Sequence, residues 1–350
     1  MKNQLNLNGL WQMSSPQMGE KTIPVTLPGD NYTALYEAGI IPDPYFGKNE
    51  DLIQEYRKYT WIFSREFDVP EELLAFDSVI LDAEKVDTLA LFSLNGKKVF
   101  ESGNMFRRTT LDVKKFLKPG KNTVSVKFKP VEAEGKKIRD TLQEEIFMNG
   151  CSKVSYLNLI RKVHCHGGWD WGITLCPCGI YEPLILTGIN SCRIEHLYTE
   201  QNHSKNSVKL TAIAELYAEK SSRSSVVFKF NGEEKKVSVS LKPGNNTVQT
   251  VFDVKNPKLW WPAGYGEQAL YDLTVTAAED EKSIEVGLRT VEIINEPDQY
   301  GVSMGVRVNG VDIFCKGADW IPADAFPSRI TPAAVEELLN SVVLANMNMV

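Results

Sequence analysis

Three Asn-Gly pairs, each between two β-prone runs, constrain the fold of this chain more than any other feature. Asn95-Gly96 lies between LALFSL and KKVF, Asn231-Gly232 between VVFKF and EEKKVSVSL, and Asn309-Gly310 between GVRV and VDIFC. The two-residue turn that best matches the twist of paired strands needs positive φ at both residues, which Asn and Gly adopt most readily. The pairs therefore predict three β-hairpins and a mostly β chain.

Alternation of apolar and polar residues marks two further strands. Val124, Val126 and Phe128 form one such run, and Val237, Val239 and Leu241 form another. Each run would place one face in a core and the other in water. Residues 117–124 (LKPGKNTV) are echoed at 241–248 (LKPGNNTV). This echo fits two β-sandwiches with similar edge turns, and it equally fits a sequence that is simply a good turn.

The C-terminal segment has a different pattern. Val311–Cys315 has the composition of a strand, and residues 331–345 predict an amphipathic helix with Thr331 as cap and Pro332 at its first position. Another apolar run begins at Met347. A parallel strand–helix–strand unit buries both faces of its sheet and cannot stand alone. We therefore expect the chain to stop inside a third, α/β domain.

These signals predict a three-part organisation. A first β-domain would cover residues 1–190, a second β-sandwich residues 191–296, and the start of an incomplete α/β domain residues 297–350.

Composition narrows the class of protein. The net charge is −6, so a nucleic-acid partner is not expected. No apolar run reaches the roughly 18 residues of a membrane helix, and the first residues (MKNQLNLNGLW) lack an apolar leader. Six cysteines in 350 residues are too few for a disulfide scaffold. We expect a cytoplasmic protein that binds neither membrane nor nucleic acid, and the sequence is compatible with a homodimer.

The segment RKVHCHGGWDWG at 161–172 is the first candidate site. An aromatic face can pack on the C–H surface of a sugar ring, and a carboxylate can accept hydrogen bonds from paired hydroxyls. Trp169 and Asp170 could therefore form a sugar subsite. The alternative is a buried tryptophan pair beside an aspartate that caps a turn.

Histidines and cysteines also gather in this region, at His164, Cys165, His166, Cys176 and Cys178. Structural zinc sites usually space their cysteines by two to four residues, whereas Cys-Pro-Cys leaves only one residue between them. A His/Cys catalytic pair would lack a third group to orient it. We expect no metal, no cofactor and reduced thiols.

Two aromatic segments follow. Residues 259–271 (LWWPAGYGEQALY) could form a ligand platform, but an aromatic turn that closes a sandwich or contacts a neighbouring domain is favoured. Residues 315–326 (CKGADWIPADAF) follow a predicted strand, where active-site loops of α/β barrels lie, so Trp320 and Asp324 are candidates by position. The alternative is a proline-shaped turn with Asp324 solvated and Trp320 in a domain contact.

Four segments in this order and spacing resemble glycoside hydrolase family 2, in its β-mannosidase branch. They are GLW near the start, RKVHCHGGWDWG, LWWPAGYGEQALY, and KGADWIPAD before a helix that ends in NMNMV. The resemblance covers essentially the whole chain. It implies a jelly-roll, galactose-binding-like sandwich, then an immunoglobulin-like sandwich, then the first strand and helix of a (β/α)8 barrel.

The resemblance also implies chemistry. Such enzymes are retaining and use two carboxyl groups about 5–5.5 Å apart, one as acid/base and one as nucleophile. In the family both are glutamates on later barrel strands, so we expect them beyond Val350, with no catalytic residue in this chain. The parent would hydrolyse terminal non-reducing β-D-mannose from mannosides and manno-oligosaccharides, and residues 1–350 alone would be inactive.

The family pattern transfers a limited set of substrate-binding residues. The Trp-Asp of GWDWG, here Trp169 and Asp170, would contact the mannose whose bond is cleaved, and Trp320 and Asp324 would lie at the floor of the same pocket. Two alternatives stay open: a β-galactosidase or β-glucuronidase within the family, or a non-catalytic carbohydrate-binding protein.

Overall fold

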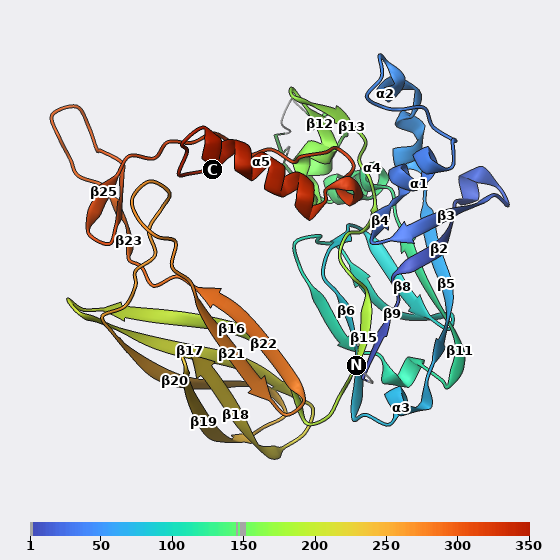
Figure 1. The fold of residues 1–350 in the computed structure, drawn as a ribbon. Helices are drawn as coiled ribbons and strands as arrows, with labels where there is room; N and C mark the ends of the chain where they lie inside the picture. The colour runs from blue at the N-terminus through green and yellow to red at the C-terminus, as the bar shows by residue number, and fades with distance from the viewer. Residues whose placement is uncertain (1–2, 145, 148–151) are drawn as a thin grey trace. The chain divides into compact units, whose positions relative to one another are not determined.

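The structure is a computed structural model that describes residues 3–144, 146–147 and 152–350. The chain forms two compact units (Figure 1). The first contains residues 1–188 and 322–332, and the second contains residues 189–321 and 333–350. Both are built mainly from strands. A short stretch near the C-terminus therefore packs with the N-terminal unit, whereas the residues on either side of it cluster with the second unit.

The first unit is a sandwich of two antiparallel sheets. The larger sheet has the order β3-β2-β5-β11-β8-β9 and the smaller has the order β1-β15-β6-β10. The strands of the larger sheet are β2 (Gly9–Ser14), β3 (Thr22–Leu27), β5 (Trp61–Val69), β8 (Ala90–Leu94), β9 (Lys97–Ser102) and β11 (Gly120–Phe128). Those of the smaller sheet are β1 (Gln4–Asn6), β6 (Ser78–Ala83), β10 (Thr109–Asp112) and β15 (Ile185–Ile189).

One hydrophobic core lies between these sheets. Phe63 and Val126 of the larger sheet and Val79 and Leu186 of the smaller sheet belong to the same buried cluster. The alternation expected in β11 is confirmed, because its apolar residues at 124, 126 and 128 are all buried. Full burial of such a side chain contributes about 1.5–3 kcal/mol, so the alternating pattern fixes which face of the strand turns inward.

Short elements surround the sandwich and carry the loops of the site. A three-stranded sheet joins β4 (Gly29–Asp30), β14 (Gly179–Ile180) and β7 (Val86–Asp87). The helices of this unit are α1 (Asn31–Glu37), α2 (Asn49–Leu52), α3 (Glu71–Leu74) and α4 (Val131–Arg139). A separate hairpin consists of β12 (Gly167–Trp169) and β13 (Gly172–Thr174).

The second unit begins with an immunoglobulin-like sandwich. Its sheets have the orders β16-β17-β20 and β19-β18-β21-β22, with a common core that includes Phe228, Phe252 and Leu273. The strands are β16 (Cys192–His203), β17 (Ser207–Ala218), β18 (Ser222–Phe230), β19 (Glu233–Leu241), β20 (Gly244–Lys255), β21 (Tyr271–Ala277) and β22 (Asp280–Val286). Figure 1 shows these strands as two facing layers. The expected mostly β fold with two successive sandwiches is therefore confirmed.

All three Asn-Gly turns form hairpins. They join β8 to β9, β18 to β19, and β24 (Gly305–Val308) to β25 (Val311–Ile313). At each turn both residues have positive φ, with the Asn residues between 49° and 51° and the Gly residues between 76° and 80°. The turn chemistry predicted from the sequence is the one that the backbone adopts.

The two LKPGxNTV segments form the same local turn in different sandwiches. Asn122 donates to the carbonyls of Lys118 and Gly120, and its side-chain oxygen accepts from the Lys118 N–H. Asn246 makes the same three bonds to Lys242 and Gly244. Each turn opens a long alternating strand. Both interpretations of the echo therefore hold: the sequence is a good turn, and two sandwiches use it.

The C-terminal segment corrects one expectation. Residues 311–315 were expected to be the strand that pairs in parallel with the segment after the helix. Instead, β25 pairs antiparallel with β24 in a sheet with β23 (Val291–Ile294), because the Asn309-Gly310 turn folds it back. The parallel bridge is made by Gly317 with Met349. The predicted helix is α5 (Pro332–Leu344), and Leu338, Leu339 and Val343 on it are exposed.

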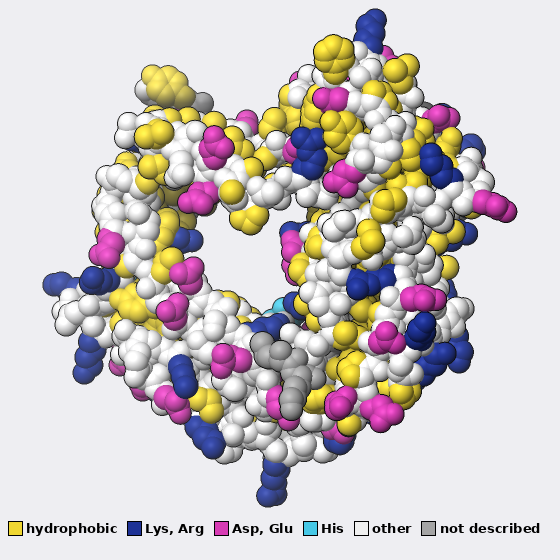
Figure 2. Space-filling view, turned by 45° about the vertical axis from the view of Figure 1, so that its right-hand side comes forward, with side chains coloured by type: hydrophobic (Ala, Val, Ile, Leu, Met, Phe, Trp, Pro, Cys, Tyr) yellow, Lys and Arg dark blue, Asp and Glu magenta, His cyan; other side chains and the backbone are white. Residues whose placement is uncertain are grey.

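The surface mixes charges of both signs. Figure 2 shows acidic and basic side chains interspersed over the visible face. Among the described residues, no helix combines the length and the apolar character that crossing a bilayer requires.

Candidate functional site

The hairpin β12–β13 carries Trp169 and Asp170 near its tip. Gly167 pairs with Thr174 and Trp169 pairs with Gly172, so Asp170 and Trp171 form the turn. Both turn residues are exposed, and Trp169 is half-buried. The hairpin therefore presents, at its tip, a carboxylate that is flanked in the sequence by two tryptophans.

Two glycines are required for this hairpin. Gly168 has a φ of +88°, and a Cβ there would lie 2.2 Å from Oγ1 of Thr174. A Cβ on Gly167 would lie 2.5 Å from Cδ2 of Leu157. Real Cβ atoms do not approach other atoms this closely, so the strand can pass here only as Gly-Gly.

Side chains in and just after α2 bind the backbone of β13, the second strand of the hairpin. Oε1 of Glu50 accepts from the Thr174 N–H at 3.1 Å, and Nε2 of Gln54 donates to the Thr174 carbonyl at 3.0 Å. The Lys153 ammonium lies 2.7 Å from Oε1 of Glu50. Burial alone would raise the pKa of Glu50, but Lys153 and the Thr174 N–H outweigh it and lower the pKa. Glu50 therefore stays charged and keeps accepting from β13.

A buried charged cluster is formed by residues that precede and follow the hairpin in the sequence. Asp87, Lys162 and His166 precede the hairpin, and Tyr181 follows it. The side chains of Asp87 and Lys162 are fully buried and form an ion pair. Oδ2 of Asp87 also accepts from the Tyr181 hydroxyl at 2.8 Å and lies 3.3 Å from Nδ1 of His166. The Lys162 ammonium donates to the Pro177 carbonyl at 2.6 Å. The cluster thus ties the chain before β12 to the chain after β13.

The electrostatics of this cluster are set by burial and pairing. Burial would raise the pKa of Asp87, but the Lys162 ammonium and His166 hold it well below its ordinary value. Burial lowers the pKa of His166, and Lys162 lowers it further. Asp87 is therefore an anion and His166 is neutral near pH 7. A buried ion pair gives little net stability but is costly to break, so the cluster fixes geometry.

The tip of the hairpin is free for a ligand. The Trp169 and Trp171 rings lie 6.4 Å apart at 37°, and Trp171 is 44% exposed. The Asp170 carboxylate has no hydrogen-bond or ion-pair partner among the residues that the structure describes. The alternative in which Asp170 caps the turn is therefore not what this structure shows. Such a tip can accept hydrogen bonds from hydroxyls and offer an apolar ring face.

The thiols and histidines near the hairpin are the side chains that could act as metal ligands or nucleophiles. Within the described ranges, no group of three or more His, Cys, Asp or Glu side chains is arranged to hold a metal ion. Cys165, Cys176 and Cys178 are free thiols. Burial raises the pKa of Cys176 to about 11 and also raises the pKa of Cys165 and Cys178. Protonated thiols are weak nucleophiles and poor ligands.

Asp324 lies in a segment that we call the strap, residues 322–332, which packs on the first unit. Phe326 at its centre is fully buried in the core of that unit, with ring centroids 6.1 Å from Tyr45 and 6.4 Å from Tyr36. Ser328 donates to Asp30, which caps α1 by accepting from the Thr33 N–H at 2.8 Å. The strap is therefore bound by both apolar packing and hydrogen bonds.

The Asp324 carboxylate is used by the strap itself. Its Oδ1 accepts from the Tyr45 hydroxyl at 2.8 Å and from the Phe326 N–H at 2.9 Å. Its Oδ2 lies 3.2 Å from Nε of Arg329. Burial, together with Asp324, raises the pKa of Tyr45 to about 12, so Tyr45 stays a hydrogen-bond donor. Asp324 thus has partners for both oxygens, unlike Asp170.

The remaining candidate, Trp320, belongs to the second unit and is 42% exposed. The structure brings Trp169 and Asp170 together on one hairpin and gives Asp324 its own partners in the first unit. Sequence analysis missed the supporting residues Asp87, Lys162 and Tyr45. Only Lys162 had a local signal, since it is the second residue of the segment RKVHCHGGWDWG.

The aromatic turn at 259–271 has a structural role, as favoured. The Arg289 guanidinium lies 4.1 Å from the Trp260 ring, and Nδ2 of Asn309 donates to the Trp260 carbonyl at 2.9 Å. The Tyr265 hydroxyl accepts from the Phe314 N–H at 3.2 Å. This turn therefore links the second sandwich to the segment with β23, β24 and β25.

Two family models match this chain. The model described as "Glycosyl hydrolase 2 galactose-binding domain-like" matches residues 11–182, and the model "Glycosyl hydrolases family 2" matches residues 192–289. The chain belongs to glycoside hydrolase family 2. Its first unit contains the galactose-binding-like domain of this family, and its second unit contains the family's immunoglobulin-like domain.

Two similar curated proteins are named as β-mannosidases. The chain is 32% identical to Beta-mannosidase B of Emericella nidulans, over 93% of this chain and 39% of the relative. It is 31% identical to Beta-mannosidase of Bos taurus, over 98% of this chain and 41% of the relative. The chain thus spans about two fifths of the length of these relatives.

Solved structures agree on the fold. The β-D-mannosidase of Dictyoglomus thermophilum matches with a TM-score of 0.93 and 29% identity, over 99% of this chain and 43% of that structure. The exo-chitosanase of Amycolatopsis orientalis matches with a TM-score of 0.76 and 19% identity, over 99% of this chain and 40% of that structure. The second likeness shows the shared family 2 fold alone.

Proposed function

We propose that this chain is the N-terminal region of a retaining β-mannosidase, in which it supplies the domains that hold the mannose. The substrate would be terminal non-reducing β-D-mannose of β-mannosides and manno-oligosaccharides. The single observation that carries the proposal is the hairpin β12–β13, which presents beside Trp169 the Asp170 carboxylate, a group without a partner among the described residues. The relatives named as β-mannosidases support the choice of sugar.

Asp170 would bind the sugar through paired hydroxyls. A carboxylate accepts several hydrogen bonds, and each such charged bond is worth about 1.5–3 kcal/mol. Trp169 would cover the apolar face of the ring and exclude water. Bonds that strengthen as the ring flattens lower the barrier, because only interactions stronger in the transition state than in the ground state accelerate the reaction.

The rigid base of the hairpin would give this contact its precision. The Asp87–Lys162 pair and the Glu50 bond to Thr174 fix both strands below the tip. Trp320 and Asp324 would contribute to the floor of the same pocket. The two catalytic carboxylates would be glutamates outside residues 1–350, so this chain positions the substrate and transfers no proton itself.

The organisation and location follow as parts of the same proposal. The division would be residues 1–190 for the jelly-roll domain, 191–296 for the immunoglobulin-like domain, and 297–350 for the start of the catalytic barrel. The five cysteines that the structure describes are free thiols, which favours a cytoplasmic location.

The first test is the length of the reading frame that encodes this chain. A frame that continues for several hundred codons and encodes two barrel-strand glutamates supports the proposal. The full-length protein would then be assayed on aryl β-D-mannoside, β-D-galactoside and β-D-glucuronide. A preference for the galactoside or glucuronide would overturn the choice of mannose. A frame that stops at Val350 would overturn the enzyme proposal and favour a sugar-binding protein.

The second test addresses the residue. In the full-length enzyme, Asp170→Ala should lower kcat/KM for the mannoside by about 100-fold or more, about 2.7 kcal/mol at 1.36 kcal/mol per tenfold. Asp272→Ala, which changes an exposed carboxylate of β21 in the second sandwich, is the matched control and should leave kcat/KM within twofold. Near-normal activity of Asp170→Ala would remove Asp170 from the site.

A further inference from the structure

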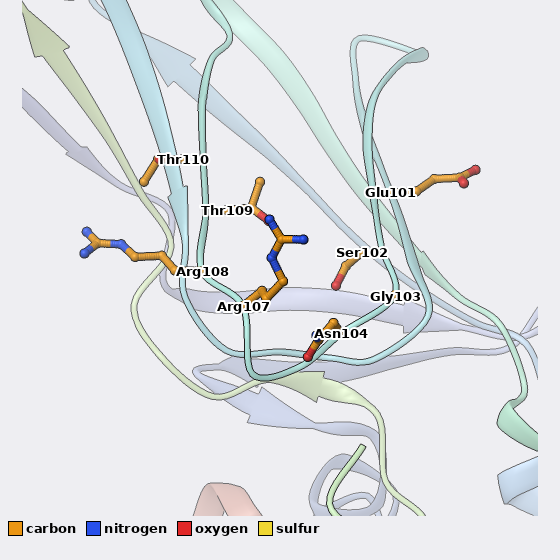
Figure 3. A pocket seen from close by; sticks show the side chains of 8 residues that line it. All are labelled: Glu101, Ser102, Gly103, Asn104, Arg107, Arg108, Thr109 and Thr110. Carbon is orange, nitrogen blue, oxygen red and sulfur yellow. The ribbon is translucent and has the colours of Figure 1, made fainter. Parts of the chain in front are cut away.

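A polar cavity opens between the two sheets of the first unit, at the edge where both sheets end. Strand β9 is the last strand of the larger sheet and β10 is the last strand of the smaller. The chain from Gly103 to Arg108 crosses from one to the other and lines a cavity of about 630 Å³ (Figure 3). This cavity shares no lining residue with the hairpin β12–β13 or the strap.

The cavity is lined mainly by hydrogen-bond donors. Ser102, Thr109 and Thr110 contribute hydroxyls, Asn104 an amide, and Arg107 a guanidinium. Oδ1 of Asn104 already accepts from the Phe106 N–H at 2.9 Å, which leaves its amide hydrogens for a ligand. A ligand with several acceptor oxygens would match this lining.

Arg107 is the most informative of these residues. Figure 3 shows its guanidinium between the two chain segments that border the cavity, whereas Arg108 points away. Arg108 forms a two-point pair with Asp82 of β6, with Nε 2.7 Å from Oδ1. The Arg107 guanidinium has no hydrogen-bond or ion-pair partner within residues 3–144, 146–147 and 152–350. Its fork of donors is therefore available for an oxyanion.

The surrounding charge favours an anion as well. Glu101 is the acidic residue of the lining, and in Figure 3 its carboxylate points away from Arg107. The Lys98 ammonium lies 2.9 Å from Glu101, and the hydrogen bond from Lys98 and the charge of Lys129 lower the pKa of Glu101. Two lysines thus face one glutamate, and Arg107 adds a further positive charge, in a chain whose net charge is −6.

We propose that this cavity binds an oxyanion group, such as phosphate, sulfate or carboxylate, either as a free ion or carried on a sugar. Arg107 would hold two of its oxygens, and Asn104 and the hydroxyls of Ser102 and Thr109 would donate to the rest. The chain would then have a second ligand site on its first unit, separate from the hairpin that presents Asp170. Its occupancy would respond to charged ligands rather than to neutral mannosides.

The experiment is a calorimetric titration of the chain with inorganic phosphate, D-glucuronate, D-mannose 6-phosphate and neutral D-mannose. The three anions should bind and should weaken as sodium chloride is added, because salt screens an exposed charge. Arg107→Gln should weaken anion binding about tenfold or more, because it removes the positive charge and the fork of donors that would hold two of the oxygens. Lys121→Gln removes one exposed positive charge outside the cavity and is the matched control, with an expected change below twofold.

Further variants separate this site from the proposed mannose site. Thr109→Val should also weaken anion binding, whereas Asp170→Ala should leave the binding of inorganic phosphate unchanged. Tighter binding of the two sugar anions than of phosphate would identify a charged glycan as the ligand, and equal binding would identify a free ion. Unchanged affinity in Arg107→Gln would overturn the proposal. So would an affinity of the Asp170→Ala chain for neutral mannose equal to its affinity for mannose 6-phosphate, or a lack of anion binding at millimolar concentration.

Discussion

Asp170 and Asp324 stand in similar surroundings in the sequence but in opposite surroundings in the fold. Each follows a tryptophan by a few residues at most, and each belongs to the first unit. The Asp170 carboxylate projects from a hairpin tip without a partner among the described residues. The Asp324 carboxylate is held by Tyr45, by the Phe326 N–H and by Arg329.

The difference shows that the two carboxylates have different roles in this fold. Asp170 has no partner among the described residues, and its hairpin is held by other groups, namely the Glu50 bond to Thr174 and the buried Asp87–Lys162 pair. Asp324 helps to hold its own segment, because its carboxylate accepts from the Tyr45 hydroxyl and the Phe326 N–H and pairs with Arg329. A carboxylate that is already saturated has less to offer a ligand than one whose oxygens are free. We therefore expect Asp170 to matter more for binding and Asp324 to matter more for stability.

The largest expected effect concerns the anchor of the strap. Phe326→Ala removes a fully buried ring from the core of the first unit and should lower its free energy of unfolding by about 3–5 kcal/mol. Hydrogen exchange of the β5 amides measures this. Phe46→Ala, at a side chain that is 75% exposed, is the control and should change the value by less than about 0.5 kcal/mol. Equal values for the two variants would show that the strap is not bound as described.

The next effect is that of Asp324→Ala. This change leaves the Tyr45 hydroxyl and the Phe326 N–H without their acceptor and should cost about 1–3 kcal/mol in the same measurement. Tyr45→Phe removes one side of the same contact and serves as the partner in a double-mutant cycle. Additive losses would contradict the coupling that the geometry requires.

The next prediction is a pH dependence of stability, which we expect from His166 in the buried cluster at the base of the hairpin. The pKa of His166 lies below its ordinary value of 6.5 because the folded state buries the ring. The folded state therefore favours the neutral form, so the stability linked to His166 is complete above pH 6.5 and is lost as pH falls through the lowered pKa. A proton NMR titration of the four histidines, with His166→Gln to assign the signal, tests this. A His166 pKa at or above 6.5 would contradict the buried cluster.

The smallest expected effect on stability is that of Asp170→Ala. Because the tip is exposed and its carboxylate has no described partner, the free energy of unfolding should change by less than about 0.5 kcal/mol. The measurement is the same hydrogen exchange, run beside Asp324→Ala as the matched substitution. A loss as large as that of Asp324→Ala would erase the contrast between the two carboxylates.

Much of the fold could be predicted because its signals are local. The three Asn-Gly turns, the alternation in β11 and the helix α5 each depend on residues within a few positions of one another. The parallel pairing expected for Val311–Cys315 was wrong, because a short β-prone run does not specify its partner. The Asn309-Gly310 turn, itself a local signal, folds Val311–Ile313 back onto β24.

For the candidate site, too, only the residues with a local sequence signal could be predicted. The sequence indicated Trp169 and Asp170, since aromatic and acidic residues between glycines form an unusual local pattern. It could not indicate Asp87, which lies 75 residues before its partner Lys162, or the contact of Thr33 with Ser328, which are 295 residues apart. Such pairs leave no local pattern, because each partner alone is an ordinary polar residue.

The sequence by itself therefore determined where the strands turn, which strand faces are apolar, and which short segment carries a tryptophan beside an aspartate. The tertiary structure alone decided, for the described residues, that Asp170 has no partner and Asp324 has several, that Lys162 is buried, and that Arg107 has no counterion. Turn and strand preferences are properties of neighbouring residues, whereas burial and charge pairing depend on which distant segments the packed core brings together.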